Sequence, residues 1–146
     1  MKLPKLLLLL SLLVMVCSCK DDDPDYKTYT PLTITVDGLK VETPGEFVKT
    51  ADIPADGVSF DFTVEFNKDI EPVYEVLVNN KSEYTRENGM NPDVTDKSWG
   101  LQLLSRKPDY KYHVEISPNE TGETREFKFM LGKGSDYAQI RLTQAK

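Results

Sequence analysis

Few residues of this 146-residue sequence belong to the types that commonly catalyse reactions or bind transition metals. His113 is the only histidine, and a catalytic triad or a histidine-ligated zinc site needs partners that no motif supplies here. The 24 Asp and Glu residues allow many carboxylate pairs, but most of them occupy the polar positions of alternating segments. We therefore interpret His113 as a surface residue and predict no catalytic residue, no cofactor and no enzymatic activity.

Oxygen-rich stretches are the other candidate for chemistry, because calcium binds several oxygen ligands at once. Residues 88–96 (Asn-Gly-Met-Asn-Pro-Asp-Val-Thr-Asp) combine such side chains with a glycine. Their spacing matches no established ligand loop, and Asn and Asp also occur in turns for their hydrogen bonds to the backbone. We predict a polar loop without a metal, with calcium binding as the alternative.

Residues 1–18 have the pattern of a secretory signal peptide. Two lysines precede an apolar run over residues 6–16 that is broken by a single serine. A membrane-spanning helix needs about 20 apolar residues, so this run is too short to be one. The pattern predicts a helical leader that is cleaved off.

Cys19 has the clearest predicted chemistry. Residues 16–19 read Val-Cys-Ser-Cys, with a branched apolar residue three positions before Cys19 and small residues directly before it. This arrangement resembles the lipobox of bacterial lipoproteins, which implies that Cys19 becomes the diacylated first residue of the mature protein. Two or three acyl chains anchor a protein firmly. Because Cys17 leaves with the leader, no thiol remains for a disulfide or a metal.

Residues 19–30 are predicted to form an extended acidic tether between the lipid and the domain. Lys20 is followed by Asp21, Asp22 and Asp23, and like charges at this density usually stay solvated. Acidic residues directly after a lipidated cysteine also resemble the export signal that sends some lipoproteins to the outer leaflet of the outer membrane. The resemblance implies a lipid-anchored protein on the outer membrane that faces the cell exterior.

The charge balance excludes one class of partner. The sequence has 18 basic and 24 acidic residues, and removal of the leader with its two lysines leaves 16 basic residues and a net charge of −8. Nucleic-acid binding needs a basic face for the phosphates. We therefore expect no nucleic-acid partner, and we expect membrane attachment through the lipid alone.

Beyond the tether, apolar and polar residues alternate with the period of two that is typical of half-buried β-strands. The clearest segment is Val58 to Phe66, in which every second residue is Val or Phe. Turn signals, such as Asp37-Gly38 and the sequence Pro-Ala-Asp-Gly at residues 54–57, separate the segments. The pattern predicts an all-β domain over residues 31–146, with a long irregular connection at residues 79–98. Its predicted fold is an immunoglobulin-like antiparallel β-sandwich of about seven to eight strands.

The last third of the sequence is similar to a known domain family. Residues 119–125 read Asn-Glu-Thr-Gly-Glu-Thr-Arg, and the last strand segment, residues 140–144, ends in a glutamine. Together with the turn at residues 53–57 and with Trp99, this resembles the BACON family, named for Bacteroidetes-associated carbohydrate-binding, often N-terminal domains. The resemblance extends over residues 47–146. It implies an immunoglobulin-like sandwich on a surface lipoprotein, and carbohydrate binding is the role proposed for such domains.

Aromatic residues are the candidates for ligand binding, because exposed rings stack on the faces of sugars. Trp99, Tyr110 and Tyr112 are in step with apolar rows, so we expect their rings in the core. The aromatic residues outside such rows are Tyr74 and Tyr84 near the long connection, Tyr137 at the start of a strand, and Tyr26 and Tyr29 on the tether. Of these, we take Tyr74, Tyr84 and Tyr137 as candidate ligand-binding residues.

These observations leave two functional hypotheses. The first is an outer-membrane surface lipoprotein whose non-catalytic domain acts as a structural, protein-interaction or spacer module. The alternative is a module that binds a glycan or a host glycoprotein. The expected partners are the membrane, through the lipid anchor, and a polysaccharide, a mucin-type glycoprotein or another surface protein.

Overall fold

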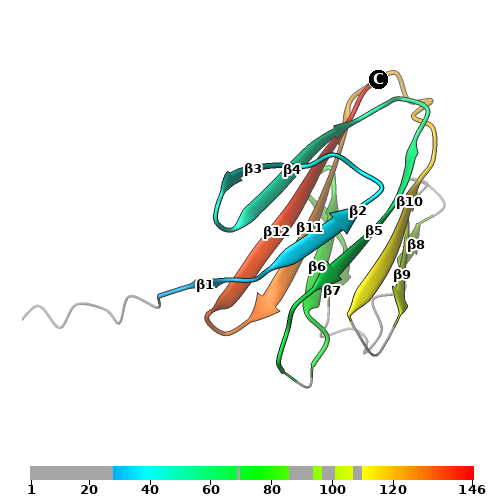
Figure 1. Cartoon of the computed structure of the whole chain (residues 1–146). Helices are drawn as coiled ribbons and strands as arrows, with labels where there is room; N and C mark the ends of the chain where they lie inside the picture. The colour runs from blue at the N-terminus through cyan, green and yellow to red at the C-terminus, as the bar shows by residue number, and fades with distance from the viewer. Residues whose placement is uncertain (1–27, 69, 86–93, 97–100, 107–109) are drawn as a thin grey trace, which may run out of the picture.

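The structure is a computed structural model that describes residues 28–68, 70–85, 94–96, 101–106 and 110–146 (Figure 1). The predicted signal peptide, Cys19 and the acidic run lie outside the described residues, as do Trp99 and most of the calcium candidate at residues 88–96. Within the described ranges, no helix has the length and hydrophobicity needed to cross a membrane.

Twelve β-strands within the described residues form two sheets. The strands are β1 (Thr30–Pro31), β2 (Ile34–Asp37), β3 (Glu42–Gly45), β4 (Val48–Ile53), β5 (Val58–Val64), β6 (Val73–Val78), β7 (Lys81–Thr85), β8 (Val94–Asp96), β9 (Leu101–Arg106), β10 (Lys111–Ile116), β11 (Arg125–Lys133) and β12 (Asp136–Gln144). The seven-stranded sheet has the order β3-β4-β12-β11-β6-β7, with β1 paired to the start of β12. The five-stranded sheet has the order β2-β5-β10-β9-β8.

The strand order is that of an immunoglobulin-like β-sandwich, as predicted. The order β2-β5-β10-β9 corresponds to strands A, B, E and D of that fold, and β12-β11-β6-β7 corresponds to G, F, C and C′. The two sheets lie face to face (Figure 1). The number of strands exceeds the predicted seven to eight because short edge strands, such as β1, β3 and β8, add to the main ones.

The core lies between the sheets and consists of the predicted alternating rows. Phe60, Phe62 and Val64 of β5 are buried, and so are the inward residues of β10, β11 and β12. The Phe62 ring is fully buried, stacks on Tyr112 with 4.7 Å between ring centroids, and lies 5.9 Å from Phe129. Burial of one such side chain contributes roughly 1.5–3 kcal/mol, so these rows suffice to align both sheets without a disulfide.

The segment at residues 79–98 is more regular than predicted. It contains β7 and β8, and β7 pairs with β6 so that Lys81 is the partner of Val78. The two residues between these strands, Asn79 and Asn80, have φ angles of 47° and 63°. A two-residue hairpin turn of type I′ requires positive φ at both positions, and Asn tolerates it. The prediction of one long irregular connection is therefore wrong.

Tyr110 also differs from its prediction. Its φ is 47°, so the backbone turns there and β10 begins one residue later. The side chain is half-buried at the edge of the core, where its hydroxyl donates a hydrogen bond to the Lys68 carbonyl at 2.7 Å and its ring meets Phe66 at 5.9 Å. Tyr112, in contrast, is fully buried as predicted.

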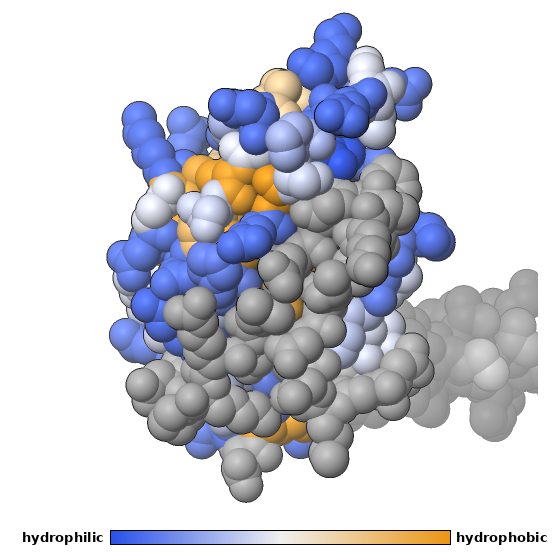
Figure 2. Space-filling model, turned by 90° about the vertical axis from the view of Figure 1, so that its right-hand side faces the viewer, coloured by the Kyte–Doolittle hydropathy of each residue, from blue (hydrophilic) through white to orange (hydrophobic). Residues whose placement is uncertain are grey.

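The described surface is mainly polar. Seen from the side of β9 and β10, hydrophilic residues predominate and the hydrophobic area is small (Figure 2). The exposed large hydrophobic side chain among the described residues is that of Tyr29, which retains 54% of its accessible surface. Tyr29 lies beside Tyr137 on the outer face of the seven-stranded sheet.

Candidate functional site

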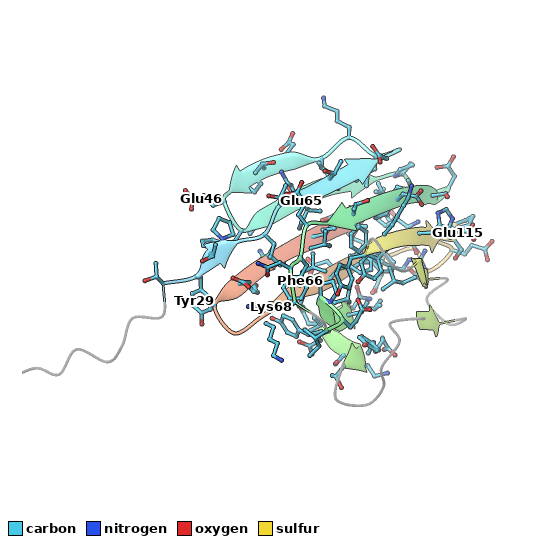
Figure 3. All side chains as sticks on the ribbon, turned by 60° about the horizontal axis from the view of Figure 1, so that its bottom comes forward. Tyr29, Glu46, Glu65, Phe66, Lys68 and Glu115 are labelled. Atoms are coloured by element: carbon cyan, nitrogen blue, oxygen red, sulfur yellow. The ribbon has the colours of Figure 1, made fainter. Side chains whose placement is uncertain are left out.

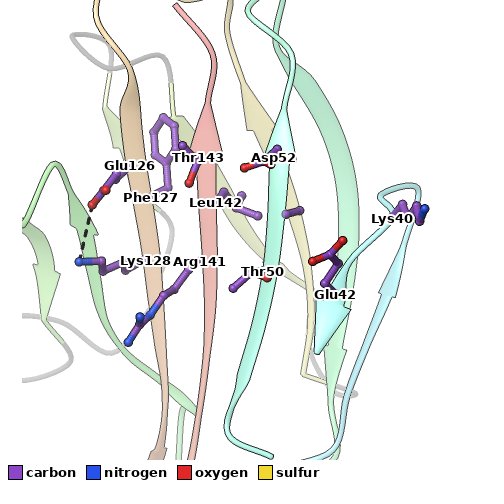
Figure 4. A pocket seen from close by; sticks show the side chains of 11 residues that line it. Lys40, Glu42, Thr50, Asp52, Glu126, Phe127, Lys128, Arg141, Leu142 and Thr143 are labelled. Atoms are coloured by element: carbon purple, nitrogen blue, oxygen red, sulfur yellow. Dashed lines mark ion pairs between the residues drawn. The ribbon is translucent and has the colours of Figure 1, made fainter. Parts of the chain in front are cut away.

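Two hollows lie along β12 on the outer face of the seven-stranded sheet. The first, which we call the tyrosine pocket, has a volume of about 710 Å³. Its lining residues are Tyr29, Phe47, Val48, Tyr74, Gly132, Lys133, Gly134, Asp136, Tyr137 and Gln139. The second, which we call the charged groove, has a volume of about 490 Å³ (Figure 4). Its lining residues are Lys40, Glu42, Thr50, Ala51, Asp52, Glu126, Phe127, Lys128, Arg141, Leu142 and Thr143.

Tyr137 is at the centre of the aromatic cluster in the tyrosine pocket. Its ring lies 6.2 Å from that of Tyr29 at an angle of 60°, and 6.1 Å from that of Phe47 at 41°. Tyr74 reaches the same pocket from β6. Aromatic rings at such distances and angles attract one another, so the cluster is held in place before any ligand arrives.

The chain segment that enters the domain forms one wall of this pocket. The Thr30 amide donates to the Ser135 carbonyl at 2.8 Å, and the Leu32 amide donates to the Tyr137 carbonyl at 3.2 Å. These bonds hold Tyr29 beside β1, at the same pole as Lys68 (Figure 3). The last residues of the segment predicted as a tether therefore belong to the folded site.

Gly132 forms the floor between the tyrosines. It is the cross-strand partner of Tyr137, and its amide donates to the Pro72 carbonyl at 2.7 Å, next to β6. Its φ is +131°, and a Cβ atom there would collide with the Asp136 carbonyl. Only glycine fits this position without strain, so Gly132 allows the backbones of β11 and β12 to approach closely beside Tyr137.

Polar groups border the aromatic rings. Asp136 forms an ion pair with Lys68, whose ammonium group also donates to the Lys133 carbonyl at 3.0 Å. Gln139 is buried although its side chain is on the outer face, and its Oε1 accepts a hydrogen bond from Arg141 Nε at 2.6 Å. Burial raises the pKa of the Tyr137 hydroxyl, so this group stays protonated at neutral pH and can donate a hydrogen bond.

The structure brings together two of the three candidate residues. Tyr74 and Tyr137 share the tyrosine pocket, whereas Tyr84 lies on β7 opposite Val76 and packs against the core. The sequence analysis assigned Tyr29 to the tether and therefore did not include it among the candidate ligand-binding residues.

His113 lies on the polar outer face of its strand, as predicted, and it has polar neighbours there that the sequence analysis did not identify. On the outer face of the five-stranded sheet it is the cross-strand partner of Asp61, and its Nδ1 lies 2.6 Å from Asp61 Oδ1. Its Nε2 lies 3.1 Å from Glu115 Oε1 and 3.5 Å from Ser59 Oγ. These neighbours escaped detection because the alternation within one strand does not reveal which strand pairs with it.

The order Ser59-His113-Asp61 is the order of contacts in a hydrolytic triad, but the geometry does not favour catalysis. The Glu115 carboxylate lies closer to Nε2 than the serine does, and none of these residues lines either hollow. A triad also needs donors for the oxyanion and a place for the substrate. His113 and Lys111 lower the pKa of Asp61 through their hydrogen bonds to its carboxylate. We therefore assign the cluster to the pairing of β5 with β10.

No described group of three or more His, Cys, Asp or Glu side chains is arranged to hold a metal ion.

Three of the residues that carry the family resemblance, Asn119, Arg125 and Gln144, lie at the other pole. Asn119 is nearly buried, and its Nδ2 donates to the carbonyls of Glu123 at 2.6 Å and Ala145 at 2.8 Å. Its Oδ1 accepts from the amide and the hydroxyl of Thr121 at 3.2 and 2.7 Å. One side chain thus closes its own turn and ties it to the end of the chain.

A buried pair completes this pole. Arg125 and Gln144 retain 3% and 0% of their accessible surface. Gln144 Oε1 accepts from Arg125 Nε at 2.9 Å and from Arg125 Nη2 at 2.5 Å. The Ser117 carbonyl accepts from Arg125 at 2.8 Å and from Gln144 Nε2 at 2.9 Å. These residues satisfy one another, so their role is to hold the turn, β11 and β12 together.

Comparisons with known proteins support the fold and go no further. No protein-family model matches the chain, and no curated protein matches it significantly. An NMR structure of a protein from Bacteroides thetaiotaomicron is similar, with a TM-score of 0.51 and 21% identity over 86% of this chain and 95% of that one. The crystal structure of the I9-I11 tandem from titin gives a TM-score of 0.35 and 20% identity over 80% of this chain, which spans 34% of the tandem. The chain therefore shares its fold with the first of these proteins.

Proposed function

We propose that this chain is a non-catalytic binding module whose tyrosine pocket receives a sugar of a glycan. One observation carries the proposal: Tyr29, Tyr74 and Tyr137 line the same pocket, and the rings of Tyr29 and Tyr137 are in contact. Sugars present apolar C–H faces edged by hydroxyls, and tyrosines offer both a ring face and a polar tip. A volume of about 710 Å³ lies within the range of small-molecule pockets.

The polar border of the pocket supports the same class of ligand. The Tyr137 hydroxyl is a donor, the Asp136 carboxylate is an acceptor, and Gln139 is placed at the pocket wall by its bond to Arg141. Few but well-placed polar groups among apolar ones are typical of sites that orient a small ligand. The spacer function, which ranked first on sequence, now ranks second, because a spacer does not need a pocket of this kind.

We also propose that the module is a BACON-like domain of a surface lipoprotein anchored through Cys19. The family proposal rests on the motif residues Asn119, Arg125 and Gln144, whose hydrogen bonds give each a structural reason to be present. The anchor and the outer-membrane location rest on the lipobox-like residues and the acidic run alone.

The binding proposal is tested with the lipid-free mature chain, residues 20–146, on a glycan microarray. Tyr29→Ala should weaken binding about tenfold, the size expected for loss of one aromatic contact, and its melting temperature should stay unchanged because the side chain is largely exposed. Tyr137→Ala should abolish binding.

Tyr84→Phe is the matched control, because it alters a tyrosine outside the pocket and keeps the ring that packs against the core. A stable wild-type protein that binds no glycan would refute the proposal and favour the spacer function. Equal losses for Tyr29→Ala and Tyr84→Phe would also contradict it.

A further inference from the structure

The charged groove brings two cationic side chains side by side. Arg141 of β12 and Lys128 of β11 are direct cross-strand partners on the outer face, and Thr50 of β4 is the partner of Arg141 on its other side. Like charges directly opposite each other in a sheet destabilise it. In a chain with a net charge of −6, this placement leaves a local site that an anion would stabilise.

A hydrogen bond orients the guanidinium group of Arg141, but no ion pair with a described residue balances its positive charge. Its Nε donates to Gln139 Oε1 at 2.6 Å, which fixes the plane of the guanidinium group and leaves the terminal nitrogens for other partners. Among the residues that the structure describes, no carboxylate forms an ion pair with Arg141. Arg141 extends from β12 across β11, on the side where Lys128 lies (Figure 4).

The positive charge of Lys128 is only partly balanced by a neighbouring carboxylate. Its ammonium group donates to Asn80 Oδ1 and lies 3.8 Å from Glu126 Oε2. That separation is longer than the roughly 2.7–2.9 Å of a strong charge-assisted hydrogen bond. An incoming oxyanion can therefore contact Lys128 without first breaking a tight ion pair.

Acidic residues restrict where such an anion can lie. Glu42, Asp52 and Lys40 line the groove on the side of β3 and β4, and Arg141, Lys128 and Glu126 line it on the side of β12 and β11. The carboxylates repel an anion, and Arg141 and Lys128 attract it. The favourable position is therefore between Arg141 and Lys128, which are direct cross-strand partners, whereas Glu126 is the partner of Thr143.

The two hollows are linked through β12. Tyr137, Gln139 and Arg141 occupy every second position of β12, so their side chains lie on the same face of the sheet. Gln139 lines the tyrosine pocket and also accepts a hydrogen bond from Arg141. At about 3.4 Å per residue, the Cα atoms of Tyr137 and Arg141 are roughly 14 Å apart. A single extended oligosaccharide can span this distance and contact both.

We propose that the ligand is an acidic glycan, and that Arg141 and Lys128 bind a carboxylate or sulfate group of the same chain whose sugar stacks on Tyr137. This inference rests on the proposed glycan-binding function. A planar guanidinium group matches two oxygens of either anion, and the lysine adds a point charge. The groove thereby selects for acidic chains over neutral ones of the same length.

The test uses the mature chain and a microarray with matched oligosaccharide pairs. One set pairs chains that carry a hexuronate or sialate with the same chains reduced at the carboxyl group, and the second set pairs sulfated with unsulfated chains. We expect about tenfold tighter binding to the acidic members of one set. Arg141→Gln and Lys128→Gln should each remove most of this preference, and Lys128→Gln, which lies outside the tyrosine pocket, should leave binding to the neutral members unchanged.

Lys111→Gln is the control, because it removes the same charge from the outer face of the other sheet. Equal binding of acidic and neutral members would overturn this inference while the proposed function stands. A loss of neutral binding in Lys128→Gln would also overturn it, since the substitution would then disturb the tyrosine pocket or the fold and not the recognition of an anion. Absence of binding to every glycan would refute the proposed function and this inference with it.

Discussion

Replacement of Gln144 by leucine should destabilise the domain more than any surface substitution nearby. The change keeps the size of a fully buried side chain and removes its amide. Arg125 then loses the acceptor of two hydrogen bonds, and the Ser117 carbonyl loses one of its two donors. The guanidinium group, which is 3% exposed, remains desolvated.

The magnitude follows from these contacts. Hydrogen bonds to charged groups contribute about 1.5–3 kcal/mol, and a buried polar group left without its partner costs a similar amount. We therefore expect Gln144→Leu to lower the free energy of unfolding by about 3 kcal/mol. For a domain of this size, such a loss lowers the melting temperature by roughly 10 °C. Thr143→Ala, at the exposed position next to it, should cost less than about 0.5 kcal/mol.

A double-mutant cycle separates this mechanism from simple loss of packing. Arg125→Met should cost about as much as Gln144→Leu, since each single change removes the hydrogen bonds between these two buried side chains. The double variant should cost less than the sum of both by about 1–2 kcal/mol. Urea titrations followed by circular dichroism measure all four free energies. Additive losses would refute the account, and so would a cost of Gln144→Leu below about 1 kcal/mol.

Two further predictions concern pH and the membrane. His113 and Lys111 hold the pKa of Asp61 below its ordinary value, so its carboxylate stabilises the fold above pH of about 4. This contribution is lost as the pH falls through the folded-state pKa, and the difference in urea midpoint between wild type and Asp61→Asn should shrink from pH 7 towards pH 3; a constant difference would contradict the linkage. Cys19→Ala should move the protein from the detergent phase to the aqueous phase in a partitioning assay, and a variant that stays with the detergent would disprove lipid anchoring.

The core was predictable from sequence because a period of two needs no knowledge of strand partners. Alternation alone placed Phe60, Phe62 and Val64 on one face, and all three are buried. The same alternation holds in β12, where Ile140 and Leu142 are buried and Arg141 and Thr143 are exposed. Side-chain direction is a local property of a strand, and a local pattern is sufficient to determine it.

The tyrosine pocket was not predictable from the sequence, because its residues come together only through the pairing of distant strands. Tyr29 and Phe47 reach Tyr137 because β1 and β4 both pair in parallel with β12, which lies at the far end of the domain sequence. Pairing partners are a non-local property, so a single sequence offers no signal for them. The same limit explains why the contact between His113 and Asp61 was missed.

The hairpin at Asn79 and Asn80 shows a different limit. The sequence signals for a two-residue turn are strongest when glycine follows Asn or Asp, and two asparagines lack that glycine. Here tertiary contacts stabilise the turn, because the Asn79 side chain accepts from the Glu126 amide at 2.8 Å and its own amide donates to the Glu126 carbonyl at 2.9 Å. Bonds to a third strand thus make a weaker turn sequence adequate.

The residues of the family motif lie far from the tyrosine pocket. This separation explains why the family resemblance indicates the fold and does not indicate the ligand. Arg125 and Gln144 lie at one end of the β11–β12 hairpin, and Gly132 and Tyr137 lie at the other. Eight residues of extended strand separate Arg125 from Lys133, which is about 27 Å. Substitutions in the tyrosine pocket therefore leave the hydrogen bonds of the motif intact, and the motif places no constraint on the shape of the pocket. A chain can keep this fold and acquire another ligand by changing only the pole that contains Tyr137.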